Sequence, residues 1–164
     1  HDTYFVVGHF HYVMFGGAGF AFFGALHYWF PKIWGKMYFE KTAKIAFTLM
    51  FVGFNFLYFP MLILGLMGMP RRYYDYLDEF TTLNVVSTVG SWVLIAGIIL
   101  MIVNLFRSYN KGDKATKDPW GGTTLEWQTA SPPTLHNFDK TPIVPKGHPY
   151  DHKRNKAETI NNDK

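Results

Sequence analysis

Two histidines, His9 and His11, lie in a long uncharged segment and are separated by a single phenylalanine, Phe10. In an α-helix each residue turns by about 100°, so side chains at positions i and i+2 point about 200° apart. The two imidazoles therefore cannot chelate one metal ion, but each can bind a different partner. Neutral imidazole is an ordinary axial ligand of haem iron. The alternative is that one or both histidines form hydrogen bonds between helices.

A carboxylate precedes the first of these histidines at Asp2. In a continuous helix, seven residues correspond to about 700°, which places Asp2 within about 20° of the face of His9 and about 10 Å along the axis. That distance is similar to the reach from a haem iron to its propionates. His1 adds a nitrogen beside the oxygens of Asp2, a combination that can bind a hard cation or hydrogen-bond to propionates.

Two adjacent arginines, Arg71 and Arg72, follow the second long apolar segment. Guanidinium groups form charge-assisted and often bidentate bonds with carboxylates, so this pair is typical of an anion site and fits haem propionates. The alternative is an exposed pair whose charge is balanced by the acidic residues that follow it: Asp75, Asp78 and Glu79.

Three long uncharged blocks must position these residues. Residues 3–31, 45–70 and 80–106 contain no acidic or basic side chain, and these blocks hold 29, 26 and 27 residues. Because about 20 residues suffice to cross the hydrocarbon core as a helix, we predict membrane helices over residues 3–31, 45–69 and 82–106. The alternative, buried helices of a large soluble protein, would require three such segments within 106 residues. The predicted fold is an all-α membrane protein.

Charges in the connecting loops predict the orientation. The loop at residues 32–44 contains four lysines and one glutamate, whereas the loop at residues 71–79 contains two arginines and three acids. By the positive-inside rule the first loop is cytoplasmic, the second is external, and the tail from residue 107 to 164 is cytoplasmic. Trp29, Phe30 and Trp34 are expected to form an aromatic belt at the membrane interface.

Composition excludes several other classes. The chain contains no cysteine, which excludes disulfides and thiolate metal sites in this segment. The net charge of +4 does not indicate nucleic-acid binding, because the first 106 residues hold 6 basic and 5 acidic residues and the surplus lies in the tail. We expect the tail to be irregular, with no metal-ligand spacing among its histidines. The sequence begins without methionine, so we expect a piece of a longer protein.

Four segments together resemble one family: HDTY at 1–4, HFHYV at 9–13, GLMGMPRRY at 65–73 and DPWGGTTLEW at 118–127. They are similar to the tenth to twelfth helices and cytoplasmic end of subunit I of the cytochrome c oxidases, in the haem-copper oxidase superfamily, in its bacterial versions. The resemblance covers residues 1 to about 138. It implies the last quarter of a twelve-helix bundle.

The resemblance also implies residue roles. His9 would be the catalytic proximal ligand of the high-spin haem (heme a3), and His11 one of two axial ligands of the low-spin haem (heme a). Phe10 would pack between the haems. The remaining residues would serve the haem propionates and a nearby Mg²⁺ ion: Arg71 and Arg72 at the propionates, His1 and Asp2 in the magnesium and propionate region. The copper (CuB) ligands belong to helices outside this sequence.

The implied activity is that of the whole subunit, and the fragment alone is not expected to catalyse it. Electrons from cytochrome c would pass through the low-spin haem to a haem-copper centre, reducing oxygen to water with proton pumping. Implied partners are the remaining helices of the subunit, the copper-bearing subunit II, subunit III, cytochrome c and the lipid of a bacterial inner membrane. The alternatives are a quinol oxidase of the same superfamily, against which Asp2, Tyr12 and Pro70 count, and a non-catalytic scaffold subunit.

Overall fold

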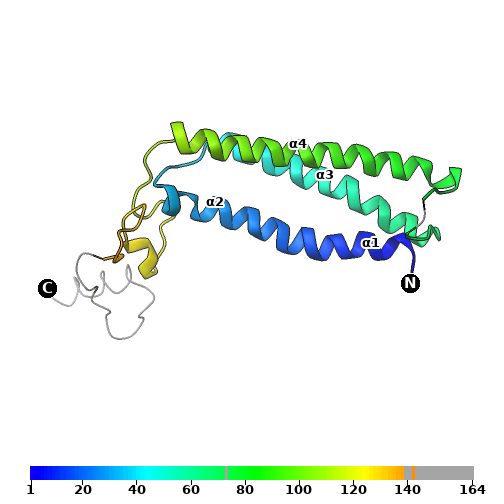
Figure 1. Cartoon of the computed structure of the whole chain (residues 1–164), viewed down its shortest axis with the longest axis horizontal. Helices are drawn as coiled ribbons and strands as arrows, with labels where there is room; N and C mark the ends of the chain where they lie inside the picture. The colour runs from blue at the N-terminus through cyan, green and yellow to red at the C-terminus, as the bar shows by residue number, and fades with distance from the viewer. Residues whose placement is uncertain (73, 139–141, 143–164) are drawn as a thin grey trace. The chain divides into compact units, whose positions relative to one another are not determined.

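The computed structural model describes residues 1–72, 74–138 and 142. The main helices are α1 (Tyr4–His11), α2 (Phe20–Trp34), α3 (Glu40–Leu66) and α4 (Thr81–Lys111), with a π-helical segment η1 (Tyr12–Gly19) and 3-10 turns η2 (Asp78–Phe80) and η3 (Leu125–Gln128). Three stretches are long and apolar enough to cross a membrane: Tyr4–Trp34, Glu40–Leu66 and Asp78–Lys111. The predicted all-α membrane architecture is confirmed (Figure 1).

Helices α2, α3 and α4 each extend beyond their uncharged block at one end, whereas the other end of α3 is Leu66, before its block ends at Pro70. Lys32 lies inside α2, and α3 begins at Glu40, where the Glu40 carboxylate lies 2.7 Å from Lys44 Nζ one turn later. An ion pair at i,i+4 supports the first turn of a helix in water. An uncharged block therefore predicts only the apolar part of a helix. The helix itself continues to a residue whose backbone conformation is not helical. For α2 that residue is Gly35, which has a φ of +66°.

The π-helical segment η1 was not expected from the sequence. It follows the two histidines directly and covers eight residues, Tyr12–Gly19. π-Helical turns are rare and often lie at functional sites. An apolar run satisfies the α and π periods equally well, so hydrophobic pattern alone gives no signal for this change.

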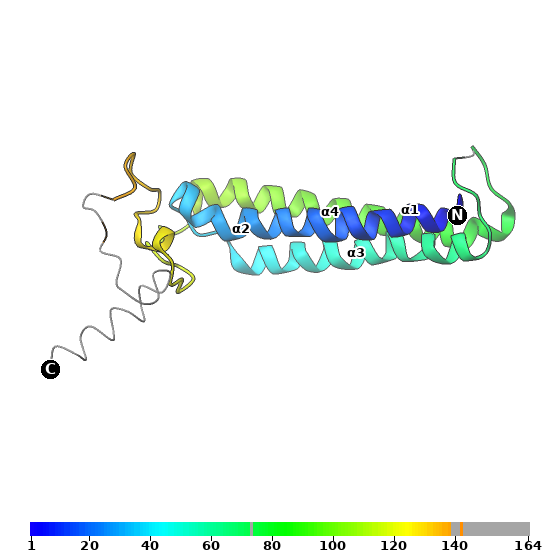
Figure 2. The same cartoon turned by 90° about the horizontal axis from the view of Figure 1, so that it is seen from below.

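The chain divides into two compact units. Unit 1 contains His1–Leu26 and Phe39–Arg107, and unit 2 contains His27–Tyr38 and the chain from Ser108 onward. In unit 1, α1, α3 and α4 lie side by side (Figures 1 and 2).

In unit 1, glycines allow α3 and α4 to approach closely. A Cβ on Gly53 would overlap the backbone of Leu94, and a Cβ on Gly90 would overlap the backbone of Leu57. Small residues at such crossings are typical of membrane helices, because their association depends on close packing. The core beside this crossing consists of large apolar side chains: Met50, Phe54, Tyr58, Leu94 and Met101.

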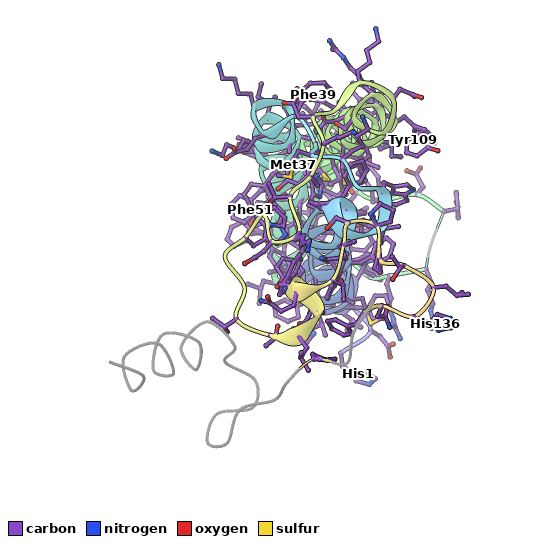
Figure 3. The ribbon with its side chains drawn as sticks, turned by 90° about the vertical axis from the view of Figure 1, so that its left-hand side faces the viewer. His1, Met37, Phe39, Phe51, Tyr109 and His136 are labelled. Atoms are coloured by element: carbon purple, nitrogen blue, oxygen red, sulfur yellow. The ribbon has the colours of Figure 1, made fainter. Side chains whose placement is uncertain are left out.

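The outer surface of unit 1 is also apolar. Phe51 of α3 is 54% exposed and projects outward (Figure 3), and other exposed residues share its character: Phe47, Phe59, Ile95, Ile99 and Phe106. An exposed apolar surface of this extent fits a lipid environment or contact with further helices.

Unit 2 is built around a buried lysine. Lys32 is 5% exposed, and its Nζ donates to the carbonyl oxygens of Lys117 (2.8 Å), Thr129 (3.1 Å) and Ala130 (3.5 Å). The Trp29 ring stacks on the Trp127 ring with centroids 5.4 Å apart.

Two expectations about this region need correction. Phe30 is only 2% exposed and so cannot present its ring in the expected interfacial belt, whereas Trp34 is 40% exposed and Trp29 is half-buried against Trp127. The described part of the tail, which was expected to be irregular, also carries a regular turn, η3, around the buried Trp127. Aromatic residues at the end of an apolar block suit either a lipid interface or a protein core, and here the turn around Trp127 provides the packing partner.

Candidate cofactor site

The end of α3 is fixed by a glycine-dependent cap. Gly68 has a φ of +91°; its N–H donates to Gly65 O (3.1 Å), while Met69 N–H donates to Leu64 O (3.0 Å). These two bonds form a Schellman motif, and its usual apolar contact is present because Leu64 and Met69 share a buried cluster. Gly65 lies directly against Phe5, where any Cβ would overlap the Phe5 backbone.

The cap directs the chain from Met69 onward toward the start of α1. Tyr4 N–H donates to Met69 O (2.8 Å), and Thr3 forms an isolated antiparallel bridge with Pro70. Two segments about 65 residues apart in sequence are thereby joined through their backbones. The join brings Arg71 to the N-terminal end of the first helix.

Arg71, Asp2 and His1 meet at this join. Arg71 donates to Asp2 twice, from its backbone N–H to Asp2 O (3.2 Å) and from Nη2 to Oδ1 (3.1 Å), and His1 Nδ1 lies 3.0 Å from Asp2 Oδ2. The structure thus brings together three of the residues selected from the sequence. Arg72 has a φ of +69° and is exposed, and it forms no ion pair or hydrogen bond within the described part of the chain.

One donor of Arg71 remains unused. The side chain is 26% exposed, and its Nε is buried with no hydrogen-bond partner among the described residues. Leaving a buried charged donor unsatisfied costs about 1–3 kcal/mol or more. A carboxylate supplied from outside this chain would satisfy it.

The histidines have different surroundings. The His11 Nδ1 lies 2.8 Å from Val7 O, and its ring stacks on the Tyr58 ring with centroids 4.5 Å apart. Since a carbonyl oxygen only accepts, Nδ1 carries the proton of the neutral ring and Nε2 keeps its lone pair. His9 is exposed on α1 and its ring stacks on Phe5, with centroids 6.4 Å apart.

Phe10 lies between them and is 53% exposed, with its ring edge-on to His11 at 5.3 Å.

The expected helical alignment of Asp2 with His9 is wrong. Thr3 caps α1, which begins at Tyr4, and Asp2 has a φ of +52° outside the helix. Asp2 is held by Arg71 and not by continuation of α1.

Comparison with known proteins decides the family. The family described as Cytochrome C and Quinol oxidase polypeptide I matches residues 1–93, more than half of this chain. This chain belongs to that family. Cytochrome c oxidase subunit 1 of Synechocystis sp. is 53% identical over 92% of the chain, and that of Thermostichus vulcanus is 46% identical over 93%. The corresponding protein of Bacillus subtilis (strain 168) is 46% identical over 88% of the chain.

The chain spans about a quarter of the length of these relatives: 27% of the Synechocystis and Thermostichus proteins and 24% of the Bacillus protein. The family implies haem and copper in the whole subunit, and two features of this segment fit haem. His11 offers Nε2 while Nδ1 is held by a backbone carbonyl, the usual outer-shell arrangement of a metal-binding histidine. Arg71 offers a buried unused N–H suited to a propionate.

Magnesium fits less well. Among residues 1–72, 74–138 and 142 no three histidine or carboxylate side chains are grouped so that they could hold a metal ion. His1 and Asp2 supply two side chains that already contact each other, so further ligands would have to come from elsewhere. Mg²⁺ commonly uses few protein carboxylates, with water completing its shell.

Sequence reasoning missed several residues that shape this site. Tyr58 stacks on His11, and Asn55 accepts a hydrogen bond from the Tyr12 hydroxyl (2.9 Å). An asparagine in the middle of an apolar block is a signal that could have found the second pair, because polar side chains in membrane helices usually have partners. Nothing in the pattern distinguishes Tyr58 from the other aromatic residues of α3.

Proposed function

We propose that this chain is part of the catalytic subunit of a respiratory terminal oxidase, in which His9 and His11 bind the irons of two different haems. The observation that carries the proposal is the arrangement in α1. The histidines stand two residues apart in an α-helix, one exposed and the other with Nδ1 held by Val7 O. That arrangement suits a helix placed between two cofactors.

The proposed roles are those that the family resemblance implies, and the positions of the residues support them. His11 is proposed to bind the low-spin haem (heme a) through Nε2, with the Val7 carbonyl fixing its tautomer. His9 is proposed to bind the high-spin haem (heme a3), where oxygen reacts. Phe10 is proposed to pack between the two macrocycles, as its exposed ring allows. When bound, the haems and a copper ion held outside this chain supply electron transfer from cytochrome c and reduction of oxygen to water, with proton pumping.

Charged residues at the outer end are proposed to hold the haem carboxylates. Arg71 contributes the unused Nε–H, and the exposed Arg72 contributes a second guanidinium. Asp2 orients Arg71, and with His1 it forms the proposed magnesium and propionate region. Guanidinium groups beside buried carboxylates favour the ionised form, because an opposite charge offsets part of the cost of burial.

Partners and a location are also proposed for the chain. The exposed apolar surfaces of unit 1 are proposed to contact the remaining helices of the subunit and lipid, in a bacterial inner membrane. Copper-bearing subunit II, subunit III and cytochrome c complete the proposed assembly, and the tail is proposed to be cytoplasmic. The names of the relatives, cytochrome c oxidase subunit 1, support this assembly.

The second candidate is a quinol oxidase, which the family description includes. Asp2, Tyr12 and Pro70 favour cytochrome c as electron donor, because quinol oxidases typically lack them. All three residues have structural roles here: Asp2 binds Arg71, Pro70 forms the bridge to Thr3, and Tyr12 donates to Asn55. A scaffold subunit without haem is the third candidate, and it gives no reason for an unused buried donor on Arg71.

Optical spectra of the full-length oxidase carrying single substitutions test the proposal. His11→Ala should remove the low-spin haem signal, whereas His9→Ala should mainly remove the signal that responds to carbon monoxide. Phe22→Ala, an exposed aromatic of the same membrane span, serves as the control and should leave both signals in place. Retention of both signals in both histidine variants would rule out the assignment.

A further inference from the structure

The His11 ring is held in two independent ways. Its Nδ1 is 2.8 Å from Val7 O, one turn earlier in the same helix. Its face lies on the Tyr58 ring of α3, with centroids 4.5 Å apart and planes inclined by 12°. The hydrogen bond fixes the position of one nitrogen, whereas the flat stacking fixes the plane of the whole ring.

Tyr58 is itself held firmly. It is 9% exposed, and its ring contacts Phe54 edge-on at 5.2 Å and Phe15 at 6.4 Å. Phe54 is 4% exposed and belongs to the same core. Close-packed side chains have few alternative rotamers, so the plane that Tyr58 presents to His11 is well defined.

The spacing between the two helices is fixed beside this contact. The Tyr12 hydroxyl donates to Asn55 Oδ1 (2.9 Å), and Asn55 Nδ2 donates to Phe51 O (2.8 Å), which sets the orientation of the amide. Tyr12 follows His11 directly and is the first residue of η1. The stack and this hydrogen bond thus join α3 to the segment around His11 at two neighbouring points.

We infer that Tyr58 is a positioning residue for His11, and that its ring sets the orientation of the imidazole plane about the iron bond. This inference rests on the proposed function, in which His11 binds the low-spin haem. The plane of an axial imidazole influences the splitting of the iron d orbitals and hence the g values of a low-spin ferric haem. The hydroxyl of Tyr58 is not required for this role, because stacking uses only the ring face.

The test uses the full-length oxidase purified in its oxidised form, with haem content measured beside the electron paramagnetic resonance spectrum. Tyr58→Phe keeps the ring and should leave the low-spin g values unchanged. Tyr58→Leu and Tyr58→Met remove the flat surface and should shift and broaden the largest g value while low-spin haem is retained. Phe59→Leu, at the exposed neighbouring position, should match the unsubstituted enzyme.

Unshifted g values at full haem content in Tyr58→Leu or Tyr58→Met would overturn the inference. If neither variant retains haem, Tyr58→Trp decides, since the larger indole cannot keep the ring plane of Tyr58 in this close-packed core. A signal shifted from that of Tyr58→Phe then supports the inference, and an unshifted one overturns it. His11→Ala, measured in parallel, separates failure of this inference from failure of the proposed function. If His11→Ala retains the low-spin signal, the assignment of His11 to the low-spin haem fails, whatever the Tyr58 variants show.

Discussion

Arg71 binds Asp2 through both its backbone and its side chain, with N–H···O at 3.2 Å and Nη2···Oδ1 at 3.1 Å. The backbone bond continues the bridge between Thr3 and Pro70, so the guanidinium is directed by main-chain pairing as well as by charge. One carboxylate oxygen is used by Arg71 and the other lies beside His1. Asp2 therefore connects the two residues proposed to face propionates and magnesium.

Replacing Arg71 by lysine tests whether the planar guanidinium, with its several N–H donors, is required for the proposed propionate contact. Lysine keeps the positive charge but cannot donate at once to Asp2 and to a second carboxylate in a fixed plane. We expect Arg71→Lys in the full-length oxidase to shift the haem midpoint potential and to lower turnover by about 10-fold, the equivalent of losing one charge-assisted hydrogen bond. Arg72→Lys should give a smaller change of the same kind. Redox titration and oxygen consumption measure both effects.

Asp75→Asn is the control for this series, because Asp75 is exposed and, within the described residues, its Oδ1 accepts only a local bond from Tyr76 N–H. Midpoint potentials and turnover in Arg71→Lys and Arg72→Lys equal to those of this control would assign the pair to the surface, and the propionate role would have to be abandoned.

The orientation of α3 can be tested from both of its ends. Lys41 lies in its first turns, and Leu77 lies in the loop that follows its other end; both are exposed. This segment contains no cysteine, so Lys41→Cys and Leu77→Cys each introduce one new thiol into it. In intact cells of a variant whose other accessible thiols are removed, an impermeant reagent should label position 77 and not position 41. Labelling with the reverse preference contradicts the predicted cytoplasmic side of the first loop.

Much of this fold was readable from the sequence, for identifiable reasons. Placing a charged side chain in hydrocarbon costs free energy, so the three uncharged blocks predicted three membrane helices. The spacing of His9 and His11 was informative because helical geometry separates i and i+2 whatever the tertiary context. Those inferences depend on local rules alone.

Other features depend on contacts that local rules do not specify. The predicted alignment of Asp2 with His9 failed because Thr3 caps the helix, which begins at Tyr4, so Asp2 lies outside it. The stacking of Tyr58 on His11 joins residues on different helices, and only the packing of those helices brings them together. The burial of Lys32 likewise depends on tail carbonyls about 85 to 98 residues away in sequence.

Two glycines at the end of α3 should respond differently to alanine. Gly65→Ala places a methyl group against the Phe5 backbone, whereas Gly68→Ala has open space but must adopt a φ of +91°. Overpacking costs about 1–3 kcal/mol or more, and an alanine in the left-handed region costs about 1–2 kcal/mol. Gly65→Ala should also separate α1 from α3 and so weaken the join to Arg71.

Thermal denaturation of the purified oxidase and its haem spectrum measure the two effects. We expect both variants to lower the denaturation temperature, and only Gly65→Ala to perturb the haem spectrum as well. Leu66→Ala, at a position 78% exposed between the two glycines, is the matched control. An unaltered spectrum in Gly65→Ala would contradict the inferred importance of the close approach.

We predict that the ammonium group of Lys32 stabilises unit 2. Its three N–H groups have three carbonyl acceptors from two separate stretches of the tail, and Nζ also lies 5.2 Å from the centre of the Trp127 ring. Hydrogen bonds to a charged group are worth about 1.5–3 kcal/mol, and a cation over an aromatic face adds about 0.5–2 kcal/mol. Lys32→Met keeps the apolar stem but leaves the three carbonyls without their donor.

Hydrogen exchange of peptides covering residues 117–131 in the full-length oxidase measures the loss. Since 1.4 kcal/mol corresponds to about tenfold in local opening, we expect exchange in Lys32→Met to be roughly 10- to 100-fold faster. Lys117→Met is a matched control, because only the backbone carbonyl of Lys117 takes part and that group survives the substitution. Equal exchange in the two variants would show that packing around Trp127 holds this part of the tail without help from the ammonium.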